Sequence, residues 1–579
     1  MALGRRLEKQ VDQRKKKVVV IGVDGATFDI ISPMIKKGRL KNFARLLKES
    51  AHGTLVSTIP PNSSVAWSSF MTGKKPGKHG VYFFMEKKPN SYARPVISAK
   101  SIKAKTLWNL LSEQGKRVIV VNVPVTYPPE KVNGFLVGGL LTPSPMSVFT
   151  HPPELHMELI AALGDYPIDT DAVDVFLNTG DEVLAYQSMV HGTRKVHEAA
   201  KLLMSKNAWD FAMVMFSITD KVAHVAWKYT IPEYQKQFPE KCAKFRGLIE
   251  TSYELVDDLI GDIISTLDED TSVIIMSDHG FGPIHEKFYV NRWLRDEGLL
   301  VLKKGGSFRL SPLRALRNFL VGPLMRKILG ERIVGMLSRI RARNLKFLKP
   351  ARDATEAPPV IDWTRTRAYS SWTGGEEVIY LNVKGREPEG IVASGEEYER
   401  LRDEIIRKLQ NLRDHDGERV VEKAYRREEI YAGPCMELAP DIQFVTRATA
   451  ILPRGELFGK PIFEKPADFS PAIHRMNGIF FMRDRNAKKG AGIQDAHIED
   501  MAPTIMHLLG LPVPEDMDGK VIAEAFQNDF LSDHPIIFKP VRVEEGDHVF
   551  AAESEPGDGT PAEEEADIRR RLKGLGYID

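Results

Sequence analysis

Two aspartates follow short apolar runs, and a glycine comes within two residues of each. Asp24 directly follows the run Val18–Val23. Asp278 comes shortly after the run Val273–Met276. Apolar runs of this length beside glycine are typical of buried strands. Both carboxylates should therefore project from the carboxyl ends of strands. In an open α/β sheet this is the edge at which ligands bind, and the glycines let the backbone turn sharply beside it.

Strand-like and helix-like segments alternate along the chain from Val18 onward. The predicted strands are Val18–Val23, Arg117–Val123, Phe211–Phe216 and Val273–Met276, and the predicted helices are Asn42–Ser50, Pro153–Leu163, Glu182–Lys206 and Pro232–Leu267. Such alternation is typical of βαβ units. The sequence therefore predicts the α/β class, with a doubly wound and mostly parallel sheet that is flanked by helices.

A basic stretch from Val301 to Pro350 interrupts this alternation, with Glu331 as its single acidic residue. Its apolar residues recur at spacings of three and four, which predicts amphipathic helices inserted into the fold. We therefore expect a basic N-terminal tail at 1–17, a first core segment at 18–299, a basic helical insert at 300–360, a second core segment with small cap-like elements at 361–530, and a C-terminal tail at 531–579.

The second half of the chain holds shorter elements. We expect strands at Ala368–Ser371 and Glu377–Val383 and a charged helix at Glu396–Leu412. A stretch rich in Glu, Gly, Pro and Ala, from about Val541 to Ala566, predicts loose order. A last helix and turn, Ile568–Tyr577, is expected to dock back onto the core.

Three roles for the basic insert are open. Charged helical faces are most often only solvated, so the first role is a cap over the active-site edge. The second is peripheral attachment to an anionic membrane through residues 301–350, because clustered Lys and Arg with interleaved apolar residues resemble an interfacial helix. Nucleic-acid binding ranks last, since no nucleic-acid-binding fold accompanies the charge, and no specific nucleic-acid partner is expected.

Composition excludes several classes of protein. A hydrophobic content of 42% and a charged content of 27% are ordinary for a folded globular protein. Residues 1–17 lack the apolar centre of a signal peptide, and no apolar stretch reaches the length of a membrane-spanning helix. We expect a cytoplasmic protein. The basic insert suggests an alternative, a peripheral position at the inner face of the membrane. Cys242 and Cys435 provide neither a disulfide framework nor a metal-ligand spacing, so any metal ligands must be Asp and His.

Several Asp and His residues have positions that suit metal ligands. Asp220 and His224 are spaced i, i+4, which places both side chains on one face of a helix. Asp278 and His279 lie where a strand passes into a loop, and His474 supplies a third imidazole. Oxygen and nitrogen donors in this mixture suit Zn²⁺ or Mn²⁺ better than Ca²⁺ or Mg²⁺. The residues together predict a site for two divalent metal ions, with Zn²⁺ favoured and Mn²⁺ as the alternative.

Ser63 is the candidate nucleophile. It follows two prolines and Asn62, so we expect it in the first turn of a helix with Asn62 near the N-cap. A helix N-terminus favours anions such as a serine alkoxide or a phosphoryl oxygen. Coordination to a metal would lower the pKa of the hydroxyl further. Ser64 is the alternative nucleophile at this turn.

These segments resemble the alkaline phosphatase superfamily and, within it, the type I phosphodiesterase/nucleotide pyrophosphatase family. The resemblance runs from about Val18 to about Ile522. The matching segments are Val23-Asp24-Gly25, Pro60 to Ser63 with Ala66-Trp67, Phe70, Thr72-Gly73 and Pro76 to Gly80, then Asp220 and His224, Asp278 to Gly282, His474, and Asp500 to Thr504. Any one of them is modest evidence, but all occur in the order of the family.

The resemblance implies an alkaline phosphatase-like fold and a division of the ligands between two ions. One ion would be held by Asp24, Ser63, Asp278 and His279, and the other by Asp220, His224 and His474. Ser63 stands where the family places its Thr or Ser nucleophile, which implies a phospho-serine intermediate.

The chain departs from the family pattern at one position. Nucleotide pyrophosphatases carry an Asn shortly after the His-Gly pair, and this Asn donates to a phosphoryl oxygen. The corresponding stretch here, Val81–Phe84, holds no Asn. The backbone N–H of Ser64 is the substitute donor that the sequence offers. The modified-nucleophile signature of sulfatases is also missing, so sulfatase activity is not expected.

Three functions compete. The leading hypothesis is a metal-dependent phosphohydrolase that cleaves phosphodiester or pyrophosphate bonds of a small-molecule substrate, for example a nucleotide or a lipid- or sugar-linked phosphate. The first alternative is a phosphotransferase or mutase of the same superfamily, which passes the phosphoryl group to an acceptor hydroxyl. The second is a catalytically silent binding protein on the same fold. Arg386 could clamp a substrate phosphate or pair with a neighbouring acid.

Overall fold

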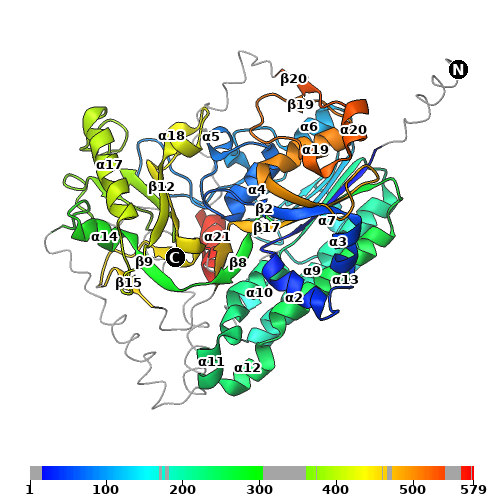
Figure 1. Cartoon of the computed structure of the whole chain (residues 1–579), viewed down its shortest axis with the longest axis horizontal. Coiled ribbons are helices and arrows are strands. Elements are labelled where there is room, and N and C mark those ends of the chain that lie inside the picture. Colours follow the sequence, from blue (N-terminus) through cyan, green and yellow to red (C-terminus); the bar gives the residue numbers. More distant parts are fainter. Residues whose placement is uncertain are drawn as a thin grey trace.

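The structure, a computed structural model, describes residues 16–168, 172–175, 181–303, 360–372, 374–459, 461–465, 472–540, 562–575 and 577–578 (Figure 1). Most of the predicted basic insert, residues 304–359, lies outside the described residues, and so does the predicted membrane contact of 301–350 apart from its first three residues. The stretch that was expected to be loosely ordered is likewise outside them up to residue 561, but its last residues, 562–566, belong to a helix that begins at Ala562, so the expectation is wrong there. The domain boundaries stay predictions. None of the described helices combines the length and the apolar composition that crossing a membrane requires.

A nine-stranded sheet forms the centre of the described chain, in the order β18-β2-β17-β7-β1-β6-β3-β4-β5. Its strands are β1 (Val18–Val23), β2 (Ala51–Val56), β3 (Val118–Val123), β4 (Gly134–Gly138), β5 (Thr150–His151), β6 (Phe211–Phe216), β7 (Ser272–Met276), β17 (Asn477–Arg483) and β18 (Gly492–His497). The pairs along β7, β1, β6, β3 and β4 are parallel, whereas β17 and β5 run antiparallel to their neighbours. The predicted doubly wound, mostly parallel sheet is confirmed.

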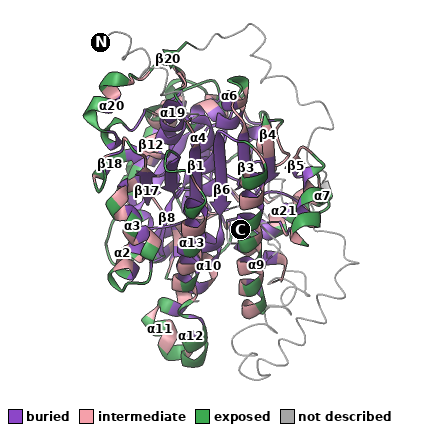
Figure 2. Cartoon of the chain, turned by 90° about the vertical axis from the view of Figure 1, so that its right-hand side faces the viewer, coloured by how far each residue is buried: buried purple, intermediate pink, exposed green. Residues whose placement is uncertain are grey.

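Alternating side chains of the sheet build two hydrophobic cores, one on each face. Val18 and Val20 of β1 face helices α4 (Ser63–Thr72), α6 (Leu107–Glu113), α19 (Met501–Leu508) and α21 (Ala562–Leu575). Val19 and Ile21 face α2 (Phe28–Lys36), α3 (Lys41–Glu49), α7 (Leu155–Leu163), α9 (Glu182–Lys206), α10 (Ile218–Ala226) and α13 (Leu248–Ser265). Figure 2 shows β1, β3 and β6 as buried strands between these helices. Because both faces of the sheet are covered, its strands read as continuous apolar runs.

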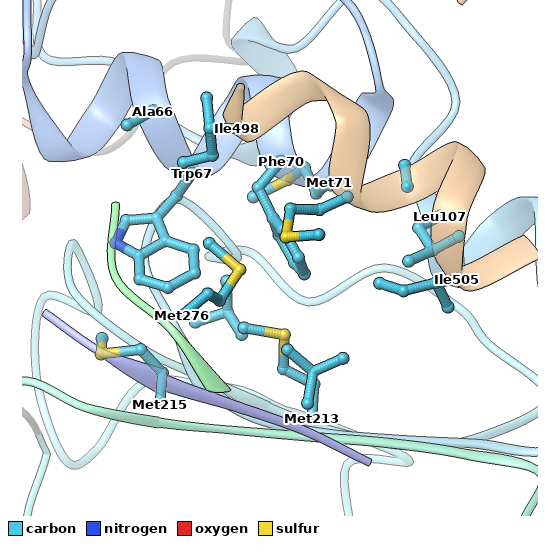
Figure 3. Packing of buried hydrophobic residues seen from close by; sticks show 14 of the residues in the cluster. Ala66, Trp67, Phe70, Met71, Leu107, Met213, Met215, Met276, Ile498 and Ile505 are labelled. Carbon is cyan, nitrogen blue, oxygen red and sulfur yellow. The ribbon is translucent and has the colours of Figure 1, made fainter. Parts of the chain in front are cut away.

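Close packing of α4 on the sheet fixes the position of this helix. Trp67 and Phe70 of α4 point toward Met213, Met215 and Met276 on the strands (Figure 3). Gly22 leaves the room that the indole needs, because a Cβ atom there would come within 2.7 Å of the Trp67 ring. The helix that begins at Ser63 is thereby held against the central strands.

A smaller antiparallel sheet lies beside the core. Its order is β10-β11-β13-β12, with β10 at Ala368–Tyr369, β11 at Val378–Leu381, β12 at Val421–Arg426 and β13 at Ile442–Thr446. Helix α17 (Glu396–Gln410) packs on it through Leu401 and Ile405. The chain enters this region after β9 (Glu286–Tyr289) and leaves it through β14 (Ile451–Arg454), and these two strands pair in parallel, with Glu286 opposite Ile451.

One predicted helix is wrong as a single element. The segment 232–267 is divided into α11 (Pro232–Gln237), α12 (Pro239–Phe245) and α13. Pro239 stands at the first turn of α12 and Phe238 before it has left the helical conformation, as expected for a residue that precedes proline. Gly247 then begins α13 as its N-cap residue. The C-terminal helix and turn do dock onto the core as predicted, through residues that include Ile568 and Leu572.

Candidate functional site

Three adjacent strands bring three carboxylates to one edge of the sheet. Strand β1 lies between β6 and β7 and is parallel to both. Asp24 directly follows β1, Asp220 lies in the first turn of α10 just after β6, and Asp278 follows β7 by two residues. All three side chains are buried. The prediction from the apolar runs, that Asp24 and Asp278 project from the carboxyl ends of strands, is confirmed.

Asp220, His224 and His474 form the first group of potential metal ligands. Oδ1 of Asp220 lies 3.5 Å from Nε2 of His224 and 3.3 Å from Nε2 of His474, and the two imidazole nitrogens are 3.1 Å apart. Ligands at about 2.0–2.1 Å from a tetrahedral Zn²⁺ ion are separated by roughly 3.3 Å. The three atoms therefore have the spacing of three ligands of one ion. Their residues come from α10 and from β16 (Ala472–Arg475), which pairs with β8 (Gly280–Pro283).

His279 is the centre of the second group. Its Nε2 atom lies 3.0 Å from Oγ of Ser63, 3.2 Å from Oδ2 of Asp278 and 3.7 Å from Oδ1 of Asp24. Asp24, Asp220 and His279 also present ligand atoms within 4.8 Å of one another, so Asp220 lies close to both groups. The structure thus brings together all seven residues that the sequence singled out.

Hydrogen bonds to backbone carbonyls orient two of the imidazoles. Nδ1 of His279 lies 2.9 Å from the carbonyl oxygen of Gly280, and Nδ1 of His474 lies 3.0 Å from that of Pro61. Because a carbonyl oxygen only accepts, the proton of each neutral ring must be on Nδ1. Each Nε2 atom therefore directs a lone pair into the site, as a metal-ligating histidine does.

The electrostatics of the site reflect the crowding of its acids. Burial, followed by the charge of Asp220, raises the pKa of Asp278 to about 7. Burial opposes ionisation of Asp220 as well, but the neighbouring His224 and His474 lower the pKa of this carboxyl well below its ordinary value. Burial and the nearby His474 lower the pKa of His279, which keeps that ring neutral. A cation placed among these groups would relieve the repulsion between the acids.

The surroundings of two carboxylate oxygens show whether the site suits metal ions. Among the described residues, no hydrogen-bond donor reaches two buried carboxylate oxygens, Oδ1 of Asp220 and Oδ2 of Asp278. Burying a charged oxygen without a partner is costly, and a bound cation is one way to satisfy it. These two atoms belong to the two groups described above. The residues therefore fit two divalent cations.

Ser63 is the first residue of α4, and its side chain is buried. As predicted, Asn62 is the N-cap, and its Oδ1 atom accepts from the backbone N–H of Ser64 at 3.1 Å. It also accepts from the hydroxyl of Ser64 at 2.6 Å. The expected role of the Ser64 N–H as a substitute donor to substrate is thus not supported, because the cap already engages it. The Ser64 hydroxyl also points at the cap, whereas the Ser63 hydroxyl points at His279.

Gly25 and Gly280 lie near the site, and glycine is needed at the two positions for different reasons. Gly25 has a φ of +66°, so the sharp turn expected after β1 is present. A Cβ atom on Gly25 would also lie 3.2 Å from the side chain of Asp220. Gly280 does not have a positive φ; a Cβ atom there would instead come within 2.2 Å of the carbonyl oxygen of Asn477. At this position the glycine allows two backbones to approach closely.

The structure adds residues that sequence reasoning missed. Nε1 of Trp67 donates to Oδ2 of Asp24 at 3.3 Å, and the hydroxyl of Thr219 donates to the carbonyl oxygen of Asp24 at 2.5 Å. The hydroxyl of Tyr577, just after α21, donates to Oδ2 of Asp220. Trp67 lies in one of the segments that match the family, and Thr219 lies next to Asp220. The sequence could therefore have pointed to both residues. Tyr577 is more than 100 residues from every other site residue, and no spacing points to it.

Arg386 pairs with neighbouring acids, which is the second of the two roles predicted for it. Its guanidinium donates to both oxygens of Asp441, at 2.7 and 2.6 Å, and to Glu387 at 2.9 Å. Asp441 is buried, so the pair is a structural ion pair of the smaller sheet. The alternative, a phosphate clamp, would require this guanidinium to leave both carboxylates.

Comparison with known proteins agrees with this geometry. The sequence model of the family described as type I phosphodiesterase / nucleotide pyrophosphatase matches residues 18–333, more than half of the 579 residues. No curated protein sequence matches the chain. Among solved structures, phosphonoacetate hydrolase from Sinorhizobium meliloti 1021 is similar with a TM-score of 0.50 and 14% identity, over 86% of this chain and 95% of that chain.

A second similar structure is human ectonucleotide pyrophosphatase / phosphodiesterase 5, with a TM-score of 0.45 and 12% identity over 90% of this chain and 99% of that chain. At these identities the phosphonoacetate hydrolase shows a shared fold alone, which is the alkaline phosphatase-like fold that the sequence predicted. The family match covers β1 to β9 and with them Asp24, Ser63, Asp220, His224, Asp278 and His279. The chain belongs to the type I phosphodiesterase/nucleotide pyrophosphatase family and is a phosphoester hydrolase.

Proposed function

We propose that the chain is a metal-dependent hydrolase that cleaves phosphodiester or pyrophosphate bonds with Ser63 as its nucleophile. Asp220, His224 and His474 hold one divalent cation, and Asp24, Ser63, Asp278 and His279 hold the other. The convergence of both ligand groups beside the Ser63 hydroxyl, which lies 3.0 Å from Nε2 of His279, carries this proposal. The mixture of carboxylate and imidazole donors favours Zn²⁺, with Mn²⁺ as the alternative.

Ser63 supplies the bond-forming oxygen. When bound, the two cations lower the pKa of the serine hydroxyl and of the attacking water and offset negative charge on the phosphoryl oxygens. The Ser63 hydroxyl gives up its proton to solvent and Oγ forms a bond to phosphorus while the bond from phosphorus to the leaving oxygen breaks. The products are a phospho-serine and the leaving group, whose oxygen takes up a proton from solvent. Water then attacks phosphorus on the opposite side, the bond to Oγ breaks, and Ser63 regains its proton.

The position of Ser63 at the start of α4 supports this role. The N-terminus of a helix carries a partial positive charge, which stabilises an alkoxide and the oxygens of a phosphoryl group. The helix is held in place by Trp67 and Phe70 in the core, and Trp67 also donates to Asp24. The hydrogen bond from Trp67 to Asp24 therefore fixes Ser63 and the Asp24 carboxylate relative to each other.

The test compares hydrolysis of bis-p-nitrophenyl phosphate and p-nitrophenyl phosphate by the full chain with Zn²⁺, with Mn²⁺ or with a chelator. We expect cleavage of the diester in preference to the monoester and loss of cleavage on chelation. Ser63→Ala should abolish most of the rate. Ser64→Ala is the matched control, since this neighbouring buried hydroxyl is bound to the Asn62 cap and should be dispensable for chemistry.

The outcomes separate the competing functions. Preference for the monoester would identify a phosphatase instead of a phosphodiesterase. If added alcohol captured most of the phosphoryl group in place of water, the transferase alternative would be correct. Cleavage that survived in Ser63→Ala but failed in Ser64→Ala would move the nucleophile to Ser64. Absence of metal-dependent turnover on either ester would favour a transferase with a different acceptor or the binding protein.

A further inference from the structure

The last described residues of the chain are anchored firmly beside the candidate site. Helix α21 lies against the core through Leu572 and Leu575 and contacts α10, the helix that carries Asp220 and His224. Arg571 of this helix forms an ion pair with Asp174 at 2.6 Å and donates to the carbonyl oxygen of Pro143 at 2.6 Å. These contacts fix the point at which the chain turns toward the site.

Tyr577 contacts every member of the group formed by Asp220, His224 and His474. Its ring centroid lies 5.2 Å from that of His224 and 5.8 Å from that of His474, and both pairs have edge-on geometry. Its hydroxyl donates to Oδ2 of Asp220. The side chain is buried, and its ring also packs on Phe84 at 5.1 Å.

The two oxygens of Asp220 have different surroundings. Oδ1 faces both imidazole nitrogens, at 3.5 and 3.3 Å, and within the described chain no hydrogen-bond donor reaches it. Oδ2 accepts the hydrogen bond from Tyr577. A carboxylate that binds a metal through one oxygen is commonly oriented by a hydrogen bond to the other, and such outer partners affect metal affinity strongly.

We propose that Tyr577 is a positioning residue of the enzyme: its hydroxyl holds Oδ2 of Asp220 so that Oδ1 points at the cation shared with His224 and His474. The inference rests on the proposed metal site and deepens it. It makes the affinity of one of the two cation sites depend on a residue from the C-terminal segment, outside the residues that match the family. Among the described residues this hydroxyl makes no hydrogen bond to Ser63, Asp278 or His279, so the group centred on His279 should be insensitive to it.

Another buried tyrosine provides a matched control. The hydroxyl of Tyr398 donates to Oδ1 of Asp441 at 2.8 Å, and Asp441 is a buried carboxylate like Asp220. This pair belongs to the smaller sheet and touches none of the seven site residues. Tyr398→Phe therefore removes the same chemical interaction from the same kind of environment, but away from the cations.

The experiment is a titration of the metal-free full chain with Zn²⁺ in competition with a chromophoric chelator. His224→Ala and Asp24→Ala first identify which binding phase belongs to which ligand group. We expect Tyr577→Phe to weaken the His224-dependent phase about 10-fold to 100-fold and to leave the Asp24-dependent phase unchanged. Tyr398→Phe should change neither phase. Circular dichroism of each metal-free variant, together with the intact Asp24-dependent phase, shows that the variant is folded.

Three results would overturn the inference. If Tyr577→Phe bound both ions as tightly as the unchanged chain, the hydroxyl would have no positioning role, although the proposed function would stand. If Tyr577→Phe raised turnover on bis-p-nitrophenyl phosphate, the hydroxyl would hinder the reaction instead of supporting it. If the unchanged chain bound no Zn²⁺ or Mn²⁺, the proposed metal sites and this inference would fail together.

Discussion

Oγ of Ser63 and Nε2 of His279 lie 3.0 Å apart, although 216 residues separate the two in sequence. The serine begins a helix on one face of the large sheet, and the histidine follows the strand β7 within that sheet. Their meeting depends on the packing of α4 against the strands through Trp67 and Phe70 in the hydrophobic core. The hydrophobic core therefore fixes the position of Ser63, the proposed nucleophile, and substitutions in that core should alter the rate of hydrolysis.

Removal of the cations should lower the melting temperature of the chain. Without them the carboxylates of Asp24, Asp220 and Asp278 repel one another in a buried space. Binding also stabilises a fold by mass action, by about 3 kcal/mol for each site held at a hundred times its dissociation constant. Thermal unfolding with and without a chelator measures the effect, and added Zn²⁺ should reverse it. Identical melting curves under both conditions would mean that no cation is bound.

Gly25→Ala should impair metal binding as well as stability. A residue with a side chain is strained at a φ of +66°, by about 1–2 kcal/mol. The new Cβ would also lie 3.2 Å from the side chain of Asp220 and push it away from the imidazoles. Gly38→Ala is the control, since its φ of +72° imposes the same strain while nothing lies within 4 Å of the added atom. Chemical denaturation should show similar losses for both variants, and Zn²⁺ titration should show a loss for Gly25→Ala alone. Equal metal affinities would refute the steric argument.

Arg386→Ala should reduce stability without raising the KM for substrate. Asp441 accepts two hydrogen bonds from this guanidinium and is buried, so the substitution leaves a buried carboxylate without its main partner. Removing one partner of a buried ion pair costs about 3–5 kcal/mol. Urea denaturation measures the loss, and steady-state kinetics on the diester measures KM. A large increase in KM with little change in stability would instead support the phosphate-clamp role.

Glu377→Gln should stabilise the fold at alkaline pH and have little effect at acidic pH. Burial raises the pKa of Glu377 from about 4.5 to about 7. Between these two values the folded chain keeps a proton that the unfolded chain loses, so the folded state becomes less stable as the pH rises through this range. The amide avoids this penalty, which amounts to about 1–3 kcal/mol.

Melting temperatures of Glu377→Gln and the unchanged chain at pH 4.5 and pH 8 provide the test. Glu396→Gln serves as the control, because the Glu396 side chain is 85% exposed on α17 and should behave alike at both pH values. A stabilisation by Glu377→Gln that was the same at both pH values would show that the acid is ionised in the fold throughout.

Much of the fold could be predicted from the sequence because its central elements are strongly patterned. The strands at Val18–Val23 and Phe211–Phe216 and the helix at Glu182–Lys206 have the bounds that the apolar patterns predicted. The division of 232–267 into three helices was missed, since the apolar periodicity continues through Pro239 and Gly247. The antiparallel insertion of β17 between β2 and β7 was also missed, because strand order depends on long-range pairing that no local pattern encodes.

The site was predictable as far as its residues lie in ordered motifs. Asp24, Asp278 and His279 follow strands, and Asp220 and His224 have helical spacing, so their convergence follows from the sheet. His474 was harder to place, since it lies on the short strand β16, and only the pairing of β16 with β8 brings it to the others. Tyr577 carries no such signal, because a single tyrosine after a helix is uninformative until its contact with Asp220 is seen.

The parallel pairing of β9 with β14 has a consequence for how such enzymes can diverge. The chain enters the smaller sheet after β9 and leaves it through β14, which pairs with β9. The two ends of the segment that carries the smaller sheet therefore lie next to each other. Insertions are tolerated where the two ends of a segment lie close together. After gene duplication, this segment could become longer or shorter or be exchanged while β1, β6 and β7 stay in register. Such changes would leave the carboxyl ends of β1, β6 and β7, and the site residues that follow them, in place.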